Sequence, residues 1–167
     1  MAVAGIPRVT FSRVIAVVTG DESDEGTVAQ AAELVRSNRG RLYILYVIRM
    51  DRSLPVDAEV GDEVRRGEEI LRACEEITRL PRGDVEAELL QAREIGPAVV
   101  HEAAVRDADC VVIGTPYPTS FGRFSLGRDI PYILERAPCH VVLWREPMRG
   151  ARSGARPRSI RDTARVG

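Results

Sequence analysis

The sequence predicts a single α/β domain built on a five-stranded parallel sheet with helices on both faces. Three observations support this fold class. Short apolar runs rich in Val and Ile alternate with longer segments whose apolar residues recur at helical spacing. The chain has 167 residues, enough for one domain of ordinary size. Its composition, 44% hydrophobic and 29% charged, is typical of soluble globular proteins.

The predicted strands cover residues 14–18, 42–48, 85–90, 109–113 and 140–144. Most are continuous apolar runs, as in strands buried on both faces, whereas residues 85–90 mostly alternate apolar with polar and indicate an exposed edge. Because strands and helices alternate, the connections are right-handed crossovers in a parallel sheet. We expect the strand order 3-2-1-4-5, with the ligand crevice between strands one and four, where the winding direction reverses.

The predicted helices cover residues 28–35, 60–78, 96–104 and 127–134. An acidic turn, residues 21–25, precedes the first helix, and its carboxylates suit the positive end of the helix dipole. The alternative is that these carboxylates bind Mg²⁺ together with a phosphate. Asp129 is predicted to cap the last helix.

The predicted domain spans residues 13–145, between an N-terminal arm, residues 1–12, and a disordered Arg-rich tail, residues 146–167. Without aromatic side chains to stack on bases, we do not expect the tail to bind nucleic acid. No segment approaches the roughly 20 apolar residues of a membrane span, and no secretion signal is recognisable, so we expect a cytoplasmic protein. The spacing of Cys74, Cys110 and Cys139 favours buried thiols over a disulfide or metal site.

Several segments resemble the universal stress protein family: residues 14–20, the run Val111-Val112-Ile113-Gly114-Thr115, its spacing to Leu126-Gly127, and residues 137–142. The resemblance extends from about residue 14 to residue 145 and implies a flavodoxin-like, adenine nucleotide alpha hydrolase-like fold. It also implies a non-enzymatic stress-response or regulatory role. A homodimer would form through the last strand, with Val142, Leu143 and Trp144 at the interface. A regulatory partner such as a transporter is a further alternative.

Family members that hold ATP share a loop G-x-x-G, nine residues, then G-[S/T], in which glycines let backbone amides approach phosphates. The chain keeps this spacing with Gly114, Tyr117 and Gly127, but Tyr117 replaces the middle glycine and Arg128 the hydroxyl residue. Thr19 stands where ATP binders carry an aspartate. By family position the nucleotide-site residues are Val17, Thr19, Val47, Ile113, Gly114, Tyr117, Gly127, Arg128 and Asp129.

These identities predict that the chain does not bind ATP in the usual pose and requires no cofactor. The alternative is an adenine nucleotide, ATP or AMP, held by Gly114 and Gly127 with Arg123 and Arg128 as phosphate contacts. Arg128 is otherwise a solvated charge beside Asp129, and Tyr117 either stacks on a base or pins the loop to the body. Neither His101 nor His140 belongs to a recognisable catalytic triad or metal-ligand set, so we expect no catalytic residues and no metal.

Overall fold

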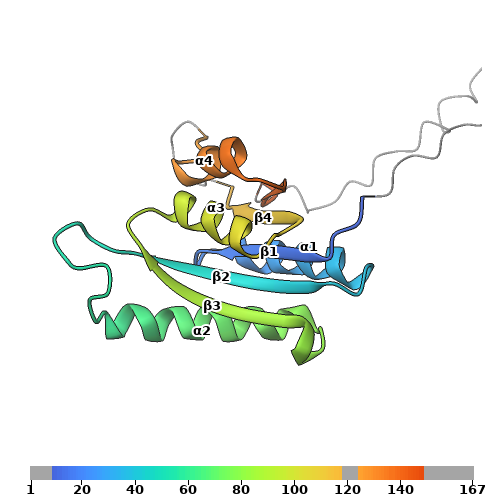
Figure 1. The fold of residues 1–167 in the computed structure, drawn as a ribbon, viewed down its shortest axis with the longest axis horizontal. Helices are drawn as coiled ribbons and strands as arrows, with labels where there is room; N and C mark the ends of the chain where they lie inside the picture. The colour runs from blue at the N-terminus through green and yellow to red at the C-terminus, as the bar shows by residue number, and fades with distance from the viewer. Residues whose placement is uncertain (1–8, 118–123, 149–167) are drawn as a thin grey trace, which may run out of the picture.

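The computed structural model describes residues 9–117 and 124–148 and has the predicted architecture (Figure 1). Five parallel strands form one sheet in the order β3-β2-β1-β4-β5. Their bounds are β1 Arg13–Val18, β2 Arg41–Arg49, β3 Val85–Ala92, β4 Cys110–Thr115 and β5 His140–Arg145. The helices are α1 Asp24–Arg36, α2 Gly61–Thr78, α3 Ile95–Val105 and α4 Asp129–Arg136, with a short 3₁₀ turn η1, Arg82–Asp84.

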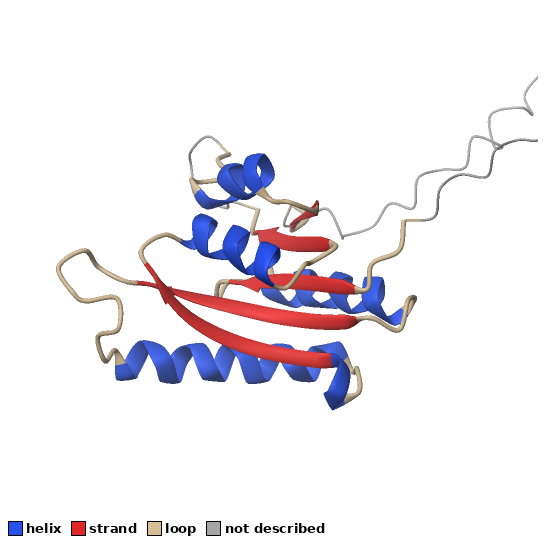
Figure 2. Cartoon of the chain, viewed as in Figure 1, coloured by secondary structure: helices blue, strands red, loops and turns tan. Residues whose placement is uncertain are grey.

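The sheet is the middle of three layers, with α1 and α2 on one face and α3 and α4 on the other (Figure 2). Side chains alternate between the faces along each strand, so the sheet separates two apolar clusters. Val14, Ala16 and Val18 of β1 pack with α1 and α2, whereas Ile15 and Val17 pack with α3 and α4. The two-sided burial explains why β1 and β4 are continuous apolar runs.

The helix α2 follows its predicted amphipathic pattern. Gly67, Leu71, Cys74 and Thr78 are buried along one face, and charged residues occupy the exposed remainder. A Cβ atom on Gly67 would lie 2.5 Å from a methyl carbon of Leu89 on β3, so the glycine lets the helix approach the sheet closely. This packing places α2 over the outer strands β2 and β3 (Figure 1).

Arg106, which follows α3, lies over the face of the sheet where β2 and β3 pair. Its guanidinium lies 4.5 Å from the ring centroid of Tyr43 and pairs with Glu86 and Glu102 at 3.3 and 3.1 Å, and with Glu88. These contacts connect the end of α3 to the strands β2 and β3. The prediction that residues 85–90 form an exposed edge is confirmed by the strand order.

The predicted domain boundaries fall partly outside the described residues. Of the N-terminal arm, residues 9–12 are described, and Phe11 packs against the cluster beneath α1. The backbone amides of Ser12 and Arg13 both donate to Asp109 Oδ2, at 2.7 Å each. Of the Arg-rich tail, residues 149–167 lie outside the described part, so its predicted disorder stays a prediction.

Candidate functional site

The loop between β1 and α1 is held closed by the carboxylate of Asp24. The backbone amide of Thr19 donates to Asp24 Oδ1 at 2.9 Å, and the amide of Gly20 donates to Asp24 Oδ2 at 2.7 Å. Burial raises the pKa of the Asp24 carboxyl above its ordinary value, although the hydrogen bonds from these two amides oppose the rise. Two amides at the carboxyl end of β1 are therefore already bonded within the chain.

The acidic turn before α1 is also satisfied internally. Asp21 Oδ1 accepts hydrogen bonds from the backbone amide and the hydroxyl of Ser23, at 2.7 and 2.6 Å, while Oδ2 accepts one from the Thr19 hydroxyl at 2.7 Å. Within residues 9–117 and 124–148, no group of three or more His, Cys, Asp or Glu side chains could hold a metal ion. The predicted alternative of a Mg²⁺ site in this turn gains no support from this geometry.

Gly114, at the end of β4, faces α1 at very short range. A Cβ atom at this position would lie 2.1 Å from Thr27 Oγ1 and 2.6 Å from Ser23 Oγ. The glycine is therefore needed for packing between β4 and α1, independently of any phosphate. Three other predicted site residues, Val17, Val47 and Ile113, are buried in the cluster under α3 and α4.

Tyr117 is bound to the end of the last strand. The guanidinium of Arg145 lies 5.1 Å from the centroid of the Tyr117 ring, within the range of a cation–π contact. The backbone amide of Glu146 donates to the carbonyl of Thr115 at 3.0 Å, which extends the contact between the two segments. This favours the interpretation in which Tyr117 anchors the loop. Arg123, the other predicted contact from this loop, lies outside the described residues.

The predicted role of Asp129 as the cap of α4 is wrong. Asp129 is the first residue of α4, which begins without a side-chain cap. Its Oδ1 instead accepts a hydrogen bond from the backbone amide of Gly96 at 3.0 Å, and Oδ2 pairs with Arg49 at the end of β2. The carboxylate therefore caps the first turn of α3, whose own N-cap residue Glu94 makes no side-chain cap bond.

Arg128 makes no ion pair with its neighbour Asp129. Its side chain is 89% exposed, and its guanidinium lies 3.9 Å from Glu94 Oε1, at the limit of an ion pair. The preceding residue, Gly127, has a φ of +67°, and its amide donates to the hydroxyl of Ser125 at 3.1 Å. The positive φ gives Gly127 a local backbone role whether or not a ligand binds.

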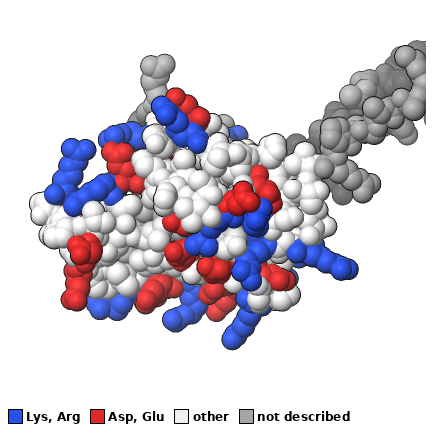
Figure 3. Space-filling view, viewed as in Figure 1, with Lys and Arg blue, Asp and Glu red and all other residues white. Residues whose placement is uncertain are grey.

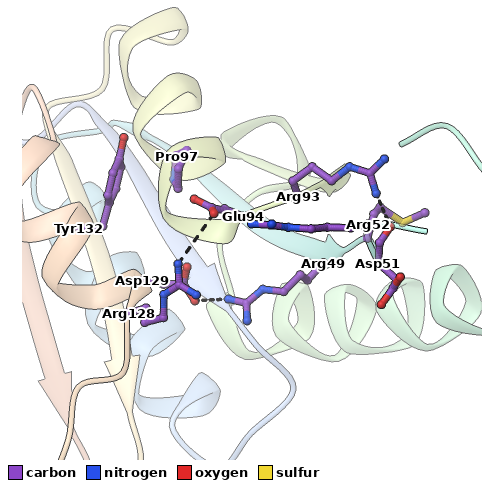
Figure 4. A pocket seen from close by; sticks show the side chains of 10 residues that line it. Arg49, Asp51, Arg52, Arg93, Glu94, Pro97, Arg128, Asp129 and Tyr132 are labelled. Atoms are coloured by element: carbon purple, nitrogen blue, oxygen red, sulfur yellow. Dashed lines mark hydrogen bonds and ion pairs between the residues drawn. The ribbon is translucent and has the colours of Figure 1, made fainter. Parts of the chain in front are cut away.

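Arginines from separate segments surround a pocket of about 420 Å³ beside Asp129 (Figure 4). The pocket lies where β2 and β3 end and α3 and α4 begin, and Figure 3 shows the mixed basic and acidic side chains of this region at the left of the view. Its lining residues are Arg49, Met50, Asp51, Arg52, Arg93, Glu94, Pro97, Arg128, Asp129 and Tyr132. The sequence prediction included only Arg128 and Asp129. The sequence did contain a signal for two of the remaining residues. Arg49 and Arg93 closely follow predicted strands, and the carboxyl ends of parallel strands lie together, where ligands bind in such sheets.

The predicted dimer residues lie on β5, the edge strand on the opposite side of the sheet from β3. Val142 packs against the cluster under α1, and Leu143 is 36% exposed. The indole N–H of Trp144 donates to Glu146 Oε1 at 2.7 Å, and a Cβ on Gly26 of α1 would lie 2.1 Å from that nitrogen. Trp144 is thus partly covered within its own chain. Among the described residues, no helix is long and apolar enough to cross a membrane.

Comparison with known proteins agrees with this architecture. A structure of a universal stress protein from Archaeoglobus fulgidus is 20% identical, with a TM-score of 0.65, covering 81% of this chain and 98% of the other. A universal stress protein solved in complex with cAMP is 17% identical, with a TM-score of 0.62, covering 83% and 99%. A family protein from Arabidopsis thaliana with AMP bound is 19% identical, with a TM-score of 0.56, covering 85% and 97%.

A search of curated proteins found no match. The similarity to the solved structures is below 25% identity and establishes the fold. The family follows from a separate comparison, in which the model of the universal stress protein family matches residues 10–145, most of the chain and all five strands. The chain is therefore a member of the universal stress protein family.

Proposed function

We propose that this universal stress protein is a regulatory, non-enzymatic domain that does not bind ATP in the pose typical of the family. The observation that carries the proposal is the carboxylate of Asp129 in the first turn of α4. A phosphate at the start of this helix would meet a negative charge, which Arg49 and the Gly96 amide hold in place.

Three further features support the proposal. Arg128 takes the position of the family's hydroxyl residue, and Tyr117, in place of the middle glycine, is in contact with Arg145. At the carboxyl end of β1, Asp24 accepts hydrogen bonds from the Thr19 and Gly20 amides. A ligand that used these amides would have to displace a buried carboxylate from two hydrogen bonds, which is energetically costly.

Calorimetric titration with ATP and Mg²⁺ tests the proposal. We expect no saturable binding at micromolar concentrations of the native protein. A variant carrying Thr19→Asp, Tyr117→Gly, Arg128→Ser and Asp129→Asn moves all four positions toward the family pattern or removes the opposing charge. This variant should bind ATP more tightly than the native protein if the four native residues are what prevents ATP binding. Micromolar binding of ATP at the Gly114–Gly127 loop of the native protein would contradict the proposal.

The second candidate function is adenine-nucleotide binding through Gly114, Gly127, Arg123 and Arg128. The intact spacing of the two glycines favours it, and relatives of similar fold have been solved with cAMP and with AMP. Nucleotide that remains bound through purification would support this function. If Arg128→Ala left that binding unchanged, Arg128 would have no role in it.

We also propose that two copies associate through β5. The strand is an edge of the sheet, and its residue Leu143 is 36% exposed. Pairing with a second β5 would satisfy the free backbone groups of the edge and bury Leu143. A regulatory protein partner, such as a transporter, is the remaining alternative, and it rests on the family resemblance alone.

A further inference from the structure

The pocket beside Asp129 contains arginine charge that the neighbouring carboxylates do not fully neutralise. Among the described residues, four arginines line it, against the three carboxylates of Asp51, Glu94 and Asp129. Asp129 is already engaged by Arg49 and by the Gly96 amide. Asp51 accepts hydrogen bonds from the amide and hydroxyl of Ser53, at 2.8 and 2.6 Å, and these bonds lower the pKa of its carboxyl.

The guanidinium of Arg93 is bonded mainly to neutral acceptors. It donates to the backbone carbonyl of Asp51 and, at 2.5 Å, to that of Leu54. These bonds fix the position of the arginine at the end of β3 without cancelling its charge. Across the described part of the chain, no carboxylate lies within ion-pair distance of Arg93 or Arg52. Within residues 9–117 and 124–148, the one ion-pair contact of Arg128 is that with Glu94 at 3.9 Å.

The arrangement also has the shape of a small-molecule site. Figure 4 shows Arg49 reaching Asp129, Arg128 reaching Glu94, and the side chain of Arg52 extending into the same region. Pro97 and Tyr132, which is 37% exposed, supply a less polar wall. The volume of about 420 Å³ lies within the range of roughly 300–1,000 Å³ that small ligands occupy.

We propose that this pocket binds a small phosphate-bearing anion through Arg52, Arg93 and Arg128. Guanidinium groups donate paired N–H bonds that match phosphate oxygens. Arg93 is held ready by two backbone carbonyls, so binding does not have to order it. No lining residue comes from β1 or β4, so the site shares only Arg128 and Asp129 with the nucleotide site expected between those strands.

The site goes beyond the function proposed above, because it gives the regulatory domain a ligand that does not use the Gly114–Gly127 loop. The variant Arg52→Gln separates the two ideas. ATP binding that is lost in Arg52→Gln would belong to this pocket and leave the first proposal intact. ATP binding that persists in Arg52→Gln would point to the loop and contradict the first proposal only.

Calorimetric titration with inorganic pyrophosphate tests the pocket directly. We expect saturable binding in the native chain, weakened about tenfold or more by Arg52→Gln and by Arg128→Gln, because each loses charge-assisted hydrogen bonds. The matched control is Arg66→Gln on α2, which removes the same charge at an exposed position away from the pocket. Thermal unfolding of each variant checks that the fold is retained.

Succinate provides the comparison between anion types. Much weaker binding of succinate than of pyrophosphate is expected, and equal binding would overturn the assignment to phosphate chemistry. The site itself would be refuted by an absence of pyrophosphate saturation up to millimolar concentration. An equal loss of affinity in Arg66→Gln would refute it too, because binding would then follow total charge.

Discussion

The carboxylate of Asp129 on α4 accepts a hydrogen bond from the backbone amide of Gly96 on α3, with 3.0 Å between Oδ1 and N. Its other oxygen pairs with Arg49 at the end of β2. One side chain therefore connects two helix N-termini and a strand end where the parallel strands reach their carboxyl ends. Its charge is the main reason to expect altered ligand chemistry here.

Removing the charge of Asp129 should cost stability mainly through the cap of α3. We expect Asp129→Asn to lower the free energy of unfolding by about 1 kcal/mol or less, since Asn retains one acceptor oxygen. The ion pair with Arg49 contributes only a few tenths of a kcal/mol to this free energy, because the Arg49 side chain is more than half exposed. Urea denaturation measures the effect, with Arg49→Gln as the control that removes the ion pair alone. A larger loss in Arg49→Gln than in Asp129→Asn would contradict the capping role.

The buried carboxyl of Asp24 should make stability depend on pH. Because burial raises its pKa in the folded state, the folded chain holds the proton more tightly than the unfolded chain. The contribution of Asp24 is thus fully present below its unfolded pKa and declines as pH rises through the folded pKa. Measured against Asp24→Asn, the native protein should gain relative stability as pH falls from 7 through the carboxyl range. If the native protein instead lost stability relative to Asp24→Asn as the pH fell, the hydrogen bonds from Thr19 and Gly20 would outweigh burial in setting the pKa of Asp24.

Gly114 should not tolerate even one added methyl group. In Gly114→Ala the new Cβ would collide with the Thr27 and Ser23 hydroxyl oxygens, at 2.1 and 2.6 Å, so α1 or these side chains must shift. We expect a loss of about 1–3 kcal/mol of unfolding free energy, as for other overpacked positions. Gly83→Ala is the control, because its added Cβ has nothing within 4 Å. Equal stability of the two variants would mean that α1 moves freely.

The three thiols should differ in reactivity. Burial raises the pKa of Cys74 to about 12 and that of Cys110 to about 11, so almost no thiolate forms near neutral pH. Cys139 is less buried, and burial also raises its pKa. Alkylation followed by mass spectrometry should label Cys139 first and the other two only after unfolding. Fast labelling of Cys110 in the native protein would contradict its burial in the core.

Self-association through β5 should depend on Leu143. A charge placed there by Leu143→Arg would have to be buried between two copies, so sedimentation should show a dimer for the native protein and monomer for the variant. Val105→Arg is the matched control, because Val105 is an apolar residue 66% exposed at the end of α3. Sedimentation of the native protein as a monomer at tens of micromolar would contradict the proposed dimer.

Most of the fold could be predicted from local pattern. The apolar runs at residues 14–18 and 109–113 identify buried strands because burial on both faces removes polar residues from them. The alternating run at residues 85–90 identifies an edge, since only part of that strand is covered. The alternation of strands with helices then predicted the strand order 3-2-1-4-5, which the structure confirms.

The sequence by itself determined the elements and, through the family resemblance, the positions where Tyr117 replaces a glycine and Arg128 a hydroxyl residue. Only the tertiary structure decided the partners of the polar side chains. Local rules assign Asp129 to its own helix, yet its partners Gly96 and Arg49 are 33 and 80 residues away. The physical reason is that a side-chain hydrogen bond goes to whichever donor the packed elements bring within about 3 Å, and sequence distance does not enter.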